Sequence, residues 1–237
     1  MTAVLPVLVY ALIPVVMTAI GAALAALRPP GAQLRSAVQH FAAGVVFSVV
    51  AVELLPDVAR THEYTEVAGG FAAGVVLMLV LRRFTEKPES SGSPVTMLAA
   101  VSVDLLIDGI LVGIAFAAGE KEGILLSVAL GLELLSLGLA LSFDLARAGL
   151  SRLRAAVVPV ALAAGALLAG TFAGVLLLVD ASPHLLATVL SFGCAALLFL
   201  VTEELLVEAH EVPESTATTA MFFAGFLLFL LLGMVAP

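Results

Sequence analysis

The stretch Val103–Gly119, VDLLIDGILVGIAFAAG, places two aspartates, Asp104 and Asp108, inside a run that is otherwise apolar from Met97 to Ala118. An ionised carboxylate is costly in a low-dielectric medium unless a cation or a proton neutralises it. The stretch therefore predicts one of two things. The pair is either protonated and hydrogen-bonded, holding two helices together, or it is an ion site. We favour the ion site, since Asn, Ser and Thr join membrane helices at less cost.

The composition of the whole chain is that of an all-α integral membrane protein. Hydrophobic residues make up 62% of the sequence and charged residues 12%, and the mean hydropathy is +1.20. About 20 apolar residues are needed to cross a bilayer as a helix. Eight stretches meet this condition, at about 3–26, 34–58, 67–84, 96–118, 123–146, 155–179, 185–209 and 215–236. The connections are short, so we expect a single transmembrane domain over residues 1–237, with its first helix retained.

The basic residues predict how the chain is oriented. Two of the ten, Arg60 and Lys121, fall on one side of the expected bundle, and eight fall on the other: Arg28, Arg35, Arg82, Arg83, Lys87, Arg147, Arg152 and Arg154. Because cytoplasmic connections carry the excess of Lys and Arg, both termini are expected outside the cytoplasm. We expect a multi-pass protein of the cell membrane, the inner membrane in a bacterium.

Several classes of function are disfavoured. A single cysteine, Cys194, excludes an internal disulfide and a paired-cysteine metal motif, and nothing in the sequence forms a basic patch for nucleic acid. Intramembrane aspartyl proteases take their two aspartates from different helices, whereas Asp104 and Asp108 share one. We therefore expect no enzyme.

Acidic residues dominate the polar positions at membrane depth. Asp104 and Asp108 are four residues apart, so a helix presents both on one face, where like charges repel unless a cation or protons lie between them. The next segment contains Glu133, with Ser136 close to its face, and a carboxylate at matching depth on a neighbouring helix is what a cation site between helices requires. Glu203 and Glu204 are candidates for a further ligand.

Two other segments resemble one another. ELLPD, with Glu53 and Asp57, ends the 34–58 segment, and ELLVE, with Glu204 and Glu208, ends the 185–209 segment. On the expected topology the two run in opposite directions, as in transporters built from inverted repeats. Such an arrangement would lead an ion from Glu53 and Asp57 to the central acids and out past Glu208, although solvated helix ends explain these residues equally well.

The four histidines divide into two pairs. His40 and His210 fall at the expected inner ends of their segments, where each is either an ion ligand on the exit path or an interfacial polar residue. His62 and His184 fall in outer connections and are expected to face solvent.

With these residues in view, the chain resembles the ZIP family of divalent metal-ion transporters. The likeness lies in HFAAGVVFSVVAVELLPD (40–57), TEELLVEAHE (202–211) and TATTAMFFAGFLLFLLLG (216–233), and in DLLIDGILVGIAFA (104–117) with ELLSLGLALS (133–142). The resemblance implies eight helices in a 3+2+3 arrangement with both termini outside. It also implies a metal site in which Asp104 and Asp108 take the places of the His and Glu of the HNxPEG motif, and Glu133 that of a ligand on the fifth helix.

The departures from that family are informative. Leu105 stands in place of the Asn, Ile107 and Ser136 in place of prolines, and Leu137 in place of a second glutamate. With apolar residues at 105 and 137, a second metal beside the first is hard to hold, so we expect one central site. Its ligands are all oxygens, which favours Mn²⁺, Mg²⁺ or Ca²⁺ relative to an imidazole site without excluding Zn²⁺ or Fe²⁺.

The sequence thus predicts a divalent metal-cation transporter that works by alternating access and moves its substrate inward. Two alternatives use the same scaffold: a transporter of protons or monovalent cations, and a non-transporting regulatory relative. The expected partners are the lipid bilayer and the metal-ion substrate, with no nucleic acid, and a homodimer is left open. The metal is the cargo, not a resident cofactor.

Overall fold

The protein is an all-helical bundle in which eight helical spans are long and apolar enough to cross a membrane, counted over the part of the chain that the structure describes. The structure is a computed structural model that describes residues 4–27, 31–85, 94–178, 181–210, 212–213 and 215–235. The eight expected spans are confirmed, each end lying within a few residues of its expected place. Arg28, Lys87 and most of the 85–95 connection lie outside the described residues.

Half of the spans consist of more than one helical element. In chain order the elements are α1 (Val4–Tyr10), α2 (Leu12–Leu27), α3 (Ala32–Ser48), η1 (Val49–Leu54), α4 (Leu55–Arg60), α5 (Tyr64–Thr85), α6 (Pro94–Ala118), α7 (Glu120–Arg147), α8 (Arg152–Leu162), η3 (Ala163–Leu167), α9 (Leu168–Leu178), α10 (Pro183–Phe199), η4 (Leu200–Leu205), α11 (Leu206–Ala209) and α12 (Thr216–Val235). The three η elements are π-helical, a conformation that often marks functional sites. Of the eight spans, only those formed by α5, α6, α7 and α12 are single elements.

Proline accounts for two features of the spans. Pro14 has no N–H for the carbonyl of Tyr10, and the first span is interrupted at Ala11, between α1 and α2. Pro159 likewise leaves the carbonyl of Ala155 without its helical donor. Here the hydroxyl of Ser142 on α7 donates to that carbonyl at 3.0 Å, so a neighbouring helix replaces the missing hydrogen bond.

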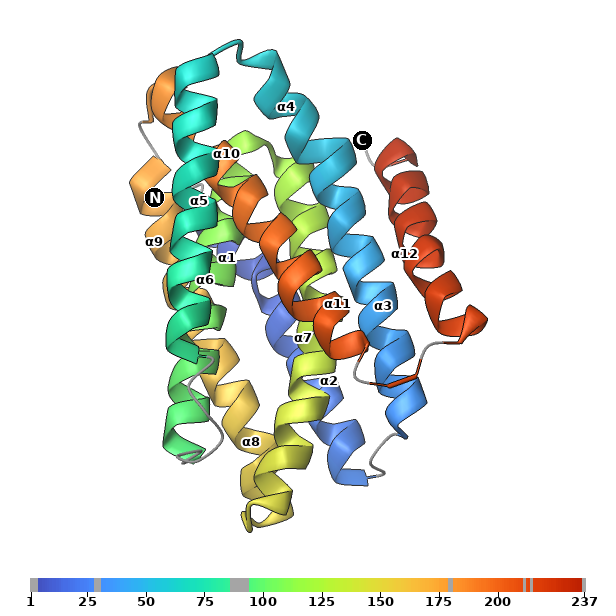
Figure 1. The fold of residues 1–237 in the computed structure, drawn as a ribbon. Coiled ribbons are helices and arrows are strands. Elements are labelled where there is room, and N and C mark those ends of the chain that lie inside the picture. Colours follow the sequence, from blue (N-terminus) through green and yellow to red (C-terminus); the bar gives the residue numbers. More distant parts are fainter. Residues whose placement is uncertain are drawn as a thin grey trace.

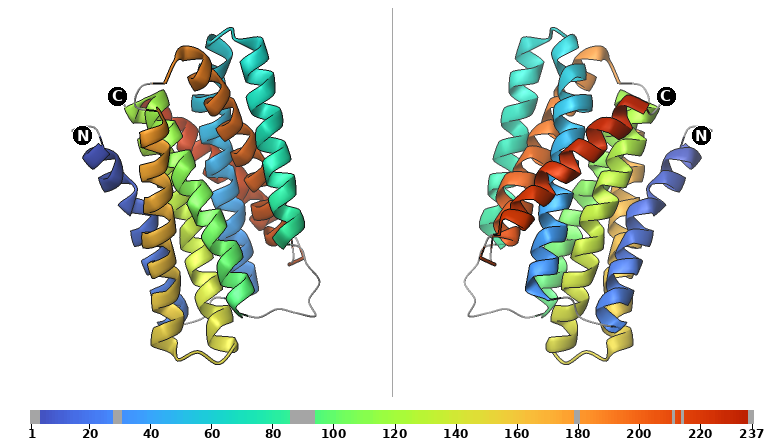
Figure 2. Two further views of the ribbon diagram at one scale, coloured as in Figure 1. Left: turned by 90° about the vertical axis from the view of Figure 1, so that its left-hand side faces the viewer. Right: turned by 90° about the vertical axis from the view of Figure 1, so that its right-hand side faces the viewer.

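Helix α7 lies at the centre of the bundle, packed against α2, α3, α6 and α8 (Figure 1). The most extensive helix pairs are α2 with α7, α3 with α12, α5 with α10, and α6 with α9. The turn between α4 and α5 marks one end of the bundle, and the first turn of α1 and the last turn of α12 lie in the same half (Figure 2). We call this the α4–α5 end, and the opposite end, where α7 leads to α8, the α7–α8 end.

Glycines allow the closest of these contacts. The backbone carbonyl of Phe222 on α12 occupies the place where a side chain on Gly44 would be, and the carbonyl of Phe41 on α3 does the same for Gly225. Reciprocal glycines of this kind let two helix backbones approach closely, which is how packing joins helices where lipid weakens the hydrophobic drive.

Candidate metal-ion site

The two most deeply buried acids lie midway along adjacent helices. Asp108 on α6 is 2% exposed and Glu133 on α7 is 5% exposed. Neither helix contains a proline inside the membrane stretch, so both run through this depth without a break. Asp104 precedes Asp108 by one turn, about 6 Å along the axis, and is partly buried. α6 and α7 thus present three carboxylates to the inside of the bundle.

Asp108 and Glu133 each have a carboxylate oxygen without a partner. Over the described residues, only three buried side-chain polar atoms lack a hydrogen bond: Asp108 Oδ2, Glu133 Oε2 and Arg35 Nε. Leaving a buried acceptor unsatisfied costs about 1–3 kcal/mol, and more when it is charged. The two oxygens lie on neighbouring helices, but among the described residues no three acids of this region offer ligand atoms that all lie within 4.8 Å of one another.

The seventh span brings two further carboxylates to this group. Glu133 lies within electrostatic range of Asp108, Asp104, Glu204 and Glu208. Glu204 lies in η4 and Glu208 in α11, one turn further along. We call these five residues the acid cluster. It begins at mid-membrane with Asp108 and Glu133 and extends towards the α7–α8 end.

Polar groups of α3 complete the cluster at that end. The Gln39 amide donates to the Glu208 carboxylate, and the rings of His40 and His210 meet edge to face with centroids 5.2 Å apart. His40 is buried, whereas His210 is exposed. The hydroxyl of Ser36 donates to the backbone carbonyl of Ala209 at 2.7 Å and ties the start of α3 to the end of α11. The sequence placed both histidines here but gave no indication of Gln39.

Glu203 and Glu204, which the sequence could not separate, have different surroundings. Glu203 forms an ion pair with Arg82 at the end of α5. Glu204 instead lies within electrostatic range of Asp104 and Glu208, as well as of Arg82. Adjacent residues on a helix point in different directions, which is enough to place the two on different faces.

Glu53 and Asp57 lie towards the α4–α5 end, apart from the acid cluster. Glu53 lies 3.5 Å from the ammonium of Lys121, and Asp57 lies 2.8 Å from the guanidinium of Arg60. Each thus has a basic partner, unlike Asp108 and Glu133. The nearby Cys194 is a buried free thiol, as expected of a small apolar residue in a helix.

The structure also locates Ser136, Leu105 and Leu137, the residues near the central acids that the sequence singled out. Ser136 is buried on α7, one turn after Glu133. Leu105 is 1% exposed and belongs to the apolar core, and Leu137 packs against that core. Both positions are therefore filled by aliphatic side chains.

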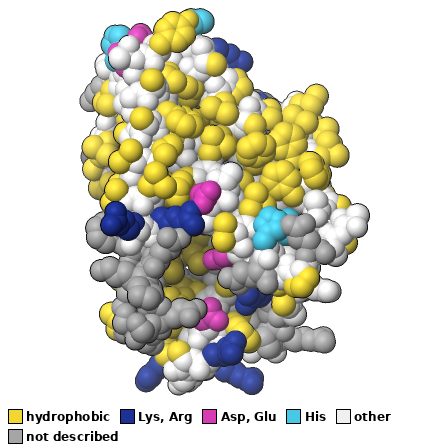
Figure 3. All heavy atoms as spheres, viewed as in Figure 1, with side chains coloured by type: hydrophobic (Ala, Val, Ile, Leu, Met, Phe, Trp, Pro, Cys, Tyr) yellow, Lys and Arg dark blue, Asp and Glu magenta, His cyan; other side chains and the backbone are white. Residues whose placement is uncertain are grey.

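The face of the bundle that carries α3, α5 and α10 is hollowed in its lower half, where acidic side chains lie one above another beside histidine and basic side chains (Figure 3). Above this hollow the same face is mostly hydrophobic. The acid cluster's direction, from mid-membrane towards the α7–α8 end, agrees with a hollow on that half.

A separate group of possible metal ligands lies at the α4–α5 end. Glu63, Glu66 and His184 offer ligand atoms that all lie within 4.8 Å of one another. His184 is exposed, as the sequence predicted for its connection, but it is held between two glutamates that the sequence had not linked to it. The signal that was missed is the pair of acids at i and i+3 where the third span begins.

Comparison of the chain with known protein families and with curated proteins found no match.

Proposed function

We propose that the protein carries a divalent metal cation across the membrane through the acid cluster, with Asp108 and Glu133 as the central ligands and Asp104 and Glu204 beside them. The observation that carries this proposal is the pair of unpartnered buried oxygens, Asp108 Oδ2 and Glu133 Oε2, on adjacent helices. A dication would satisfy both oxygens at once. Intramembrane acids without a basic partner are functional by default.

The donor set favours a hard cation. Every group at the centre is a carboxylate, joined by the Ser136 hydroxyl one turn away, and oxygen donors suit Mn²⁺, Mg²⁺ and Ca²⁺. Zn²⁺ and Fe²⁺ remain in the set to be tested, because affinity also follows the divalent series. The burial of Leu105 in the apolar core supports a single central ion rather than two.

The transport mechanism would be alternating access between inverted repeats in a 3+2+3 arrangement. Three observations support it. Glu53 and Glu204 lie in matching π-helical segments, η1 and η4. The pairing of α3 with α12 matches that of α5 with α10, and the pairing of α2 with α7 matches that of α6 with α9, as an exchange of the first three spans with the last three would require.

The basic residues support one orientation of the protein in the membrane. Arg35, Arg82, Arg83, Arg147, Arg152 and Arg154 lie at the ends of helices that meet near the α7–α8 end, and Arg60 and Lys121 lie at the other. The excess of arginine supports a cytoplasmic α7–α8 end, and hence extracytoplasmic termini in the cell membrane. The acid cluster then opens towards the cytoplasm. Inward movement of the cation agrees with this orientation.

The test is uptake into liposomes by purified protein, measured in turn with Zn²⁺, Mn²⁺, Fe²⁺, Mg²⁺ and Ca²⁺ and with an imposed pH gradient. Asp108→Asn should abolish uptake of every divalent ion that the parent carries. The matched control is Asp144→Asn, because Asp144 is exposed in the last turn of α7. If Asp108→Asn carries each ion as fast as the parent, the proposed site is wrong.

The same experiment separates the alternatives. Proton or monovalent-cation flux that Asp108→Asn abolishes, without divalent uptake or competition, would identify the scaffold as a carrier of those ions. If the folded parent protein carries no ion at all, the remaining hypothesis is a non-transporting regulatory protein on the same scaffold.

A further inference from the structure

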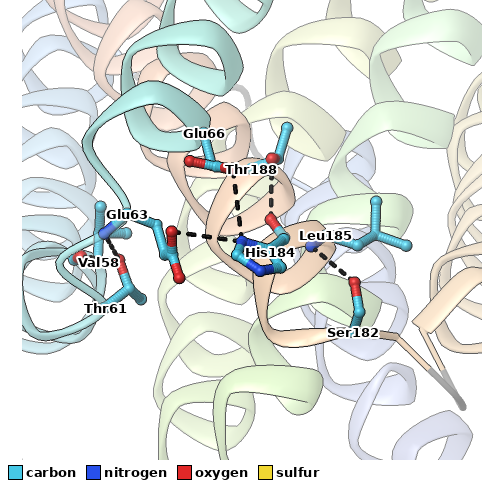
Figure 4. A network of polar contacts seen from close by, with 8 residues as sticks. All are labelled: Val58, Thr61, Glu63, Glu66, Ser182, His184, Leu185 and Thr188. Carbon is cyan, nitrogen blue, oxygen red and sulfur yellow. Dashed lines mark hydrogen bonds and ion pairs between the residues drawn. The ribbon is translucent and has the colours of Figure 1, made fainter.

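We infer a second metal site, separate from the acid cluster, formed by Glu63, Glu66 and His184 at the α4–α5 end of the bundle. Figure 4 shows the imidazole of His184 between the two carboxylates. His184 Nδ1 lies 3.3 Å from Glu63 Oε2 and 3.4 Å from Glu66 Oε1. Two helices supply these side chains: Glu63 and Glu66 lie at the start of α5, and His184 lies in the first turn of α10.

The two distances match the spacing between ligands of one metal ion. Ligands about 2.1 Å from a tetrahedral Zn²⁺ are about 3.4 Å apart. His184 Nδ1 lies at this distance from an oxygen of each glutamate, and the three ligand atoms all lie within 4.8 Å of one another.

The charge of the three side chains points the same way. A neutral imidazole is the form that binds metal. The two glutamates and the neutral imidazole would then leave a charge of −2, which a dication neutralises.

The helix backbones hold the three residues in place. Gly70 lies one turn after Glu66 and Thr188 one turn after His184, and the Thr188 backbone occupies the space where a side chain on Gly70 would be. This close approach fixes the separation of the two first turns. Further bonds hold each start. Ser182 Oγ accepts from the Leu185 N–H at 3.2 Å (Figure 4). The Glu63 carbonyl accepts from the Val67 N–H at 2.9 Å.

The ligand class differs from that of the acid cluster. An imidazole with two carboxylates suits Zn²⁺, and Co²⁺ or Ni²⁺ in its place, whereas Mg²⁺ and Ca²⁺ prefer oxygen alone. His184 is 64% exposed, so water would complete the shell and the ion would reach the site directly from solvent. The α10, η4 and α11 span separates His184 from Glu204 by 20 residues, roughly 30 Å of helix.

The experiment is protection of histidine from diethyl pyrocarbonate, read by mass spectrometry on the full chain in detergent. The background is Asp108→Asn with Glu133→Gln, so that the central acids do not compete for the ion. Zn²⁺ should slow the modification of His184 several-fold and EDTA should restore it, while Mg²⁺ at the same concentration should not. His62 is the internal control, because it is exposed on the adjoining turn and belongs to no such group.

A second variant decides the outcome. Glu63→Gln with Glu66→Gln should remove the protection of His184 and leave its modification without metal unchanged. Equal protection of His62 and His184, no protection of either, or protection that survives the double substitution would each overturn the inference. Because the readout is binding in a chain without its central acids, the result is independent of whether the protein transports an ion.

Discussion

Glu53 and Glu204 occupy the same place, the fifth residue, in two six-residue π-helical segments, η1 and η4, but have opposite surroundings. Glu53 lies beside the ammonium of Lys121, whereas Glu204 lies within electrostatic range of the carboxylates of Asp104 and Glu208. If the two segments are related by inverted repeats, this conformation of the bundle is asymmetric. The glutamate of η1, near the α4–α5 end, has a basic partner. The glutamate of η4, nearer the other end, lies among acids that a cation could neutralise.

The ion pair of Glu53 and Lys121 gives the first prediction. Glu53 is 12% exposed, so Lys121→Ala leaves a largely buried carboxylate without its cation and should lower the free energy of unfolding. Adding Glu53→Gln should restore part of the loss, because the buried charge is then gone. Thermal unfolding in detergent measures both. Arg60→Ala is the control, because its pair with Asp57 is 78% exposed on the arginine side and should contribute about 0–1 kcal/mol. A double variant less stable than Lys121→Ala would contradict the prediction.

The adjacent residues Glu203 and Glu204 give a matched pair for transport. Glu204→Gln removes a carboxylate of the acid cluster and should lower divalent uptake by at least about tenfold, the scale on which even outer partners of metal ligands matter. Glu203→Gln breaks an ion pair with Arg82 whose members are 34% and 40% exposed, and should leave uptake close to that of the parent. Initial rates in liposomes provide the comparison, and the reverse order of effects would exclude Glu204 from the path.

Asp108→Asn should have opposite effects on stability and on metal binding. Without metal, the substitution removes a buried acid that lacks a partner and lies among other acids, so the melting temperature should rise, by an amount corresponding to about 0.5–2 kcal/mol. With the transported ion present, the parent should gain stability and the variant should not. A hydrogen-bonded acid pair joining the two helices predicts the contrary, namely a variant that melts earlier with and without metal.

The sequence was sufficient for the spans but not for their partners. Hydropathy located all eight, because lipid demands about 20 apolar residues whatever lies beside them. It did not indicate the breaks at Ala11 and in η3, or which helices pair. Those depend on close contacts such as Gly44 with Phe222, between residues far apart in the chain.

The sequence was likewise sufficient for some residues of the candidate site but not for their partners. Asp104, Asp108 and Glu133 stood out because a charge in an apolar run is costly whichever helix faces it. The partners of Glu53 and Glu203 could not be named, since Lys121 and Arg82 reach them from other spans. His184 was assigned to solvent because a connection gives no sign of the neighbouring helix start.

The hydrogen bond between Ser142 and Ala155 gives a prediction about folding. Ser142→Ala should cost about 1 kcal/mol or more, because the Ala155 carbonyl has already lost its helical donor to Pro159. Ser127→Ala is the matched control: its hydroxyl donates to the Gly123 carbonyl within α7, a weaker loss since that carbonyl has a backbone donor. With Pro159→Ala, the cost of Ser142→Ala should shrink. Equal costs in both backgrounds, by thermal unfolding, would show that Pro159 is unrelated to the bond.

Glycine contacts between α3 and α12 can be separated from helix propensity by two identical substitutions. Replacing a helical glycine by alanine gains up to about 1 kcal/mol where the new methyl group has room. Gly69 on α5 has open space at that position, so Gly69→Ala should be neutral or stabilising. Gly44 does not, because the carbonyl of Phe222 already fills it and backbone cannot move aside as a side chain would. Gly44→Ala should therefore lower the melting temperature and separate α12 from α3, seen as faster proteolysis near the start of α12. Equal melting temperatures for the two variants would mean that α12 does not pack on α3 at this distance.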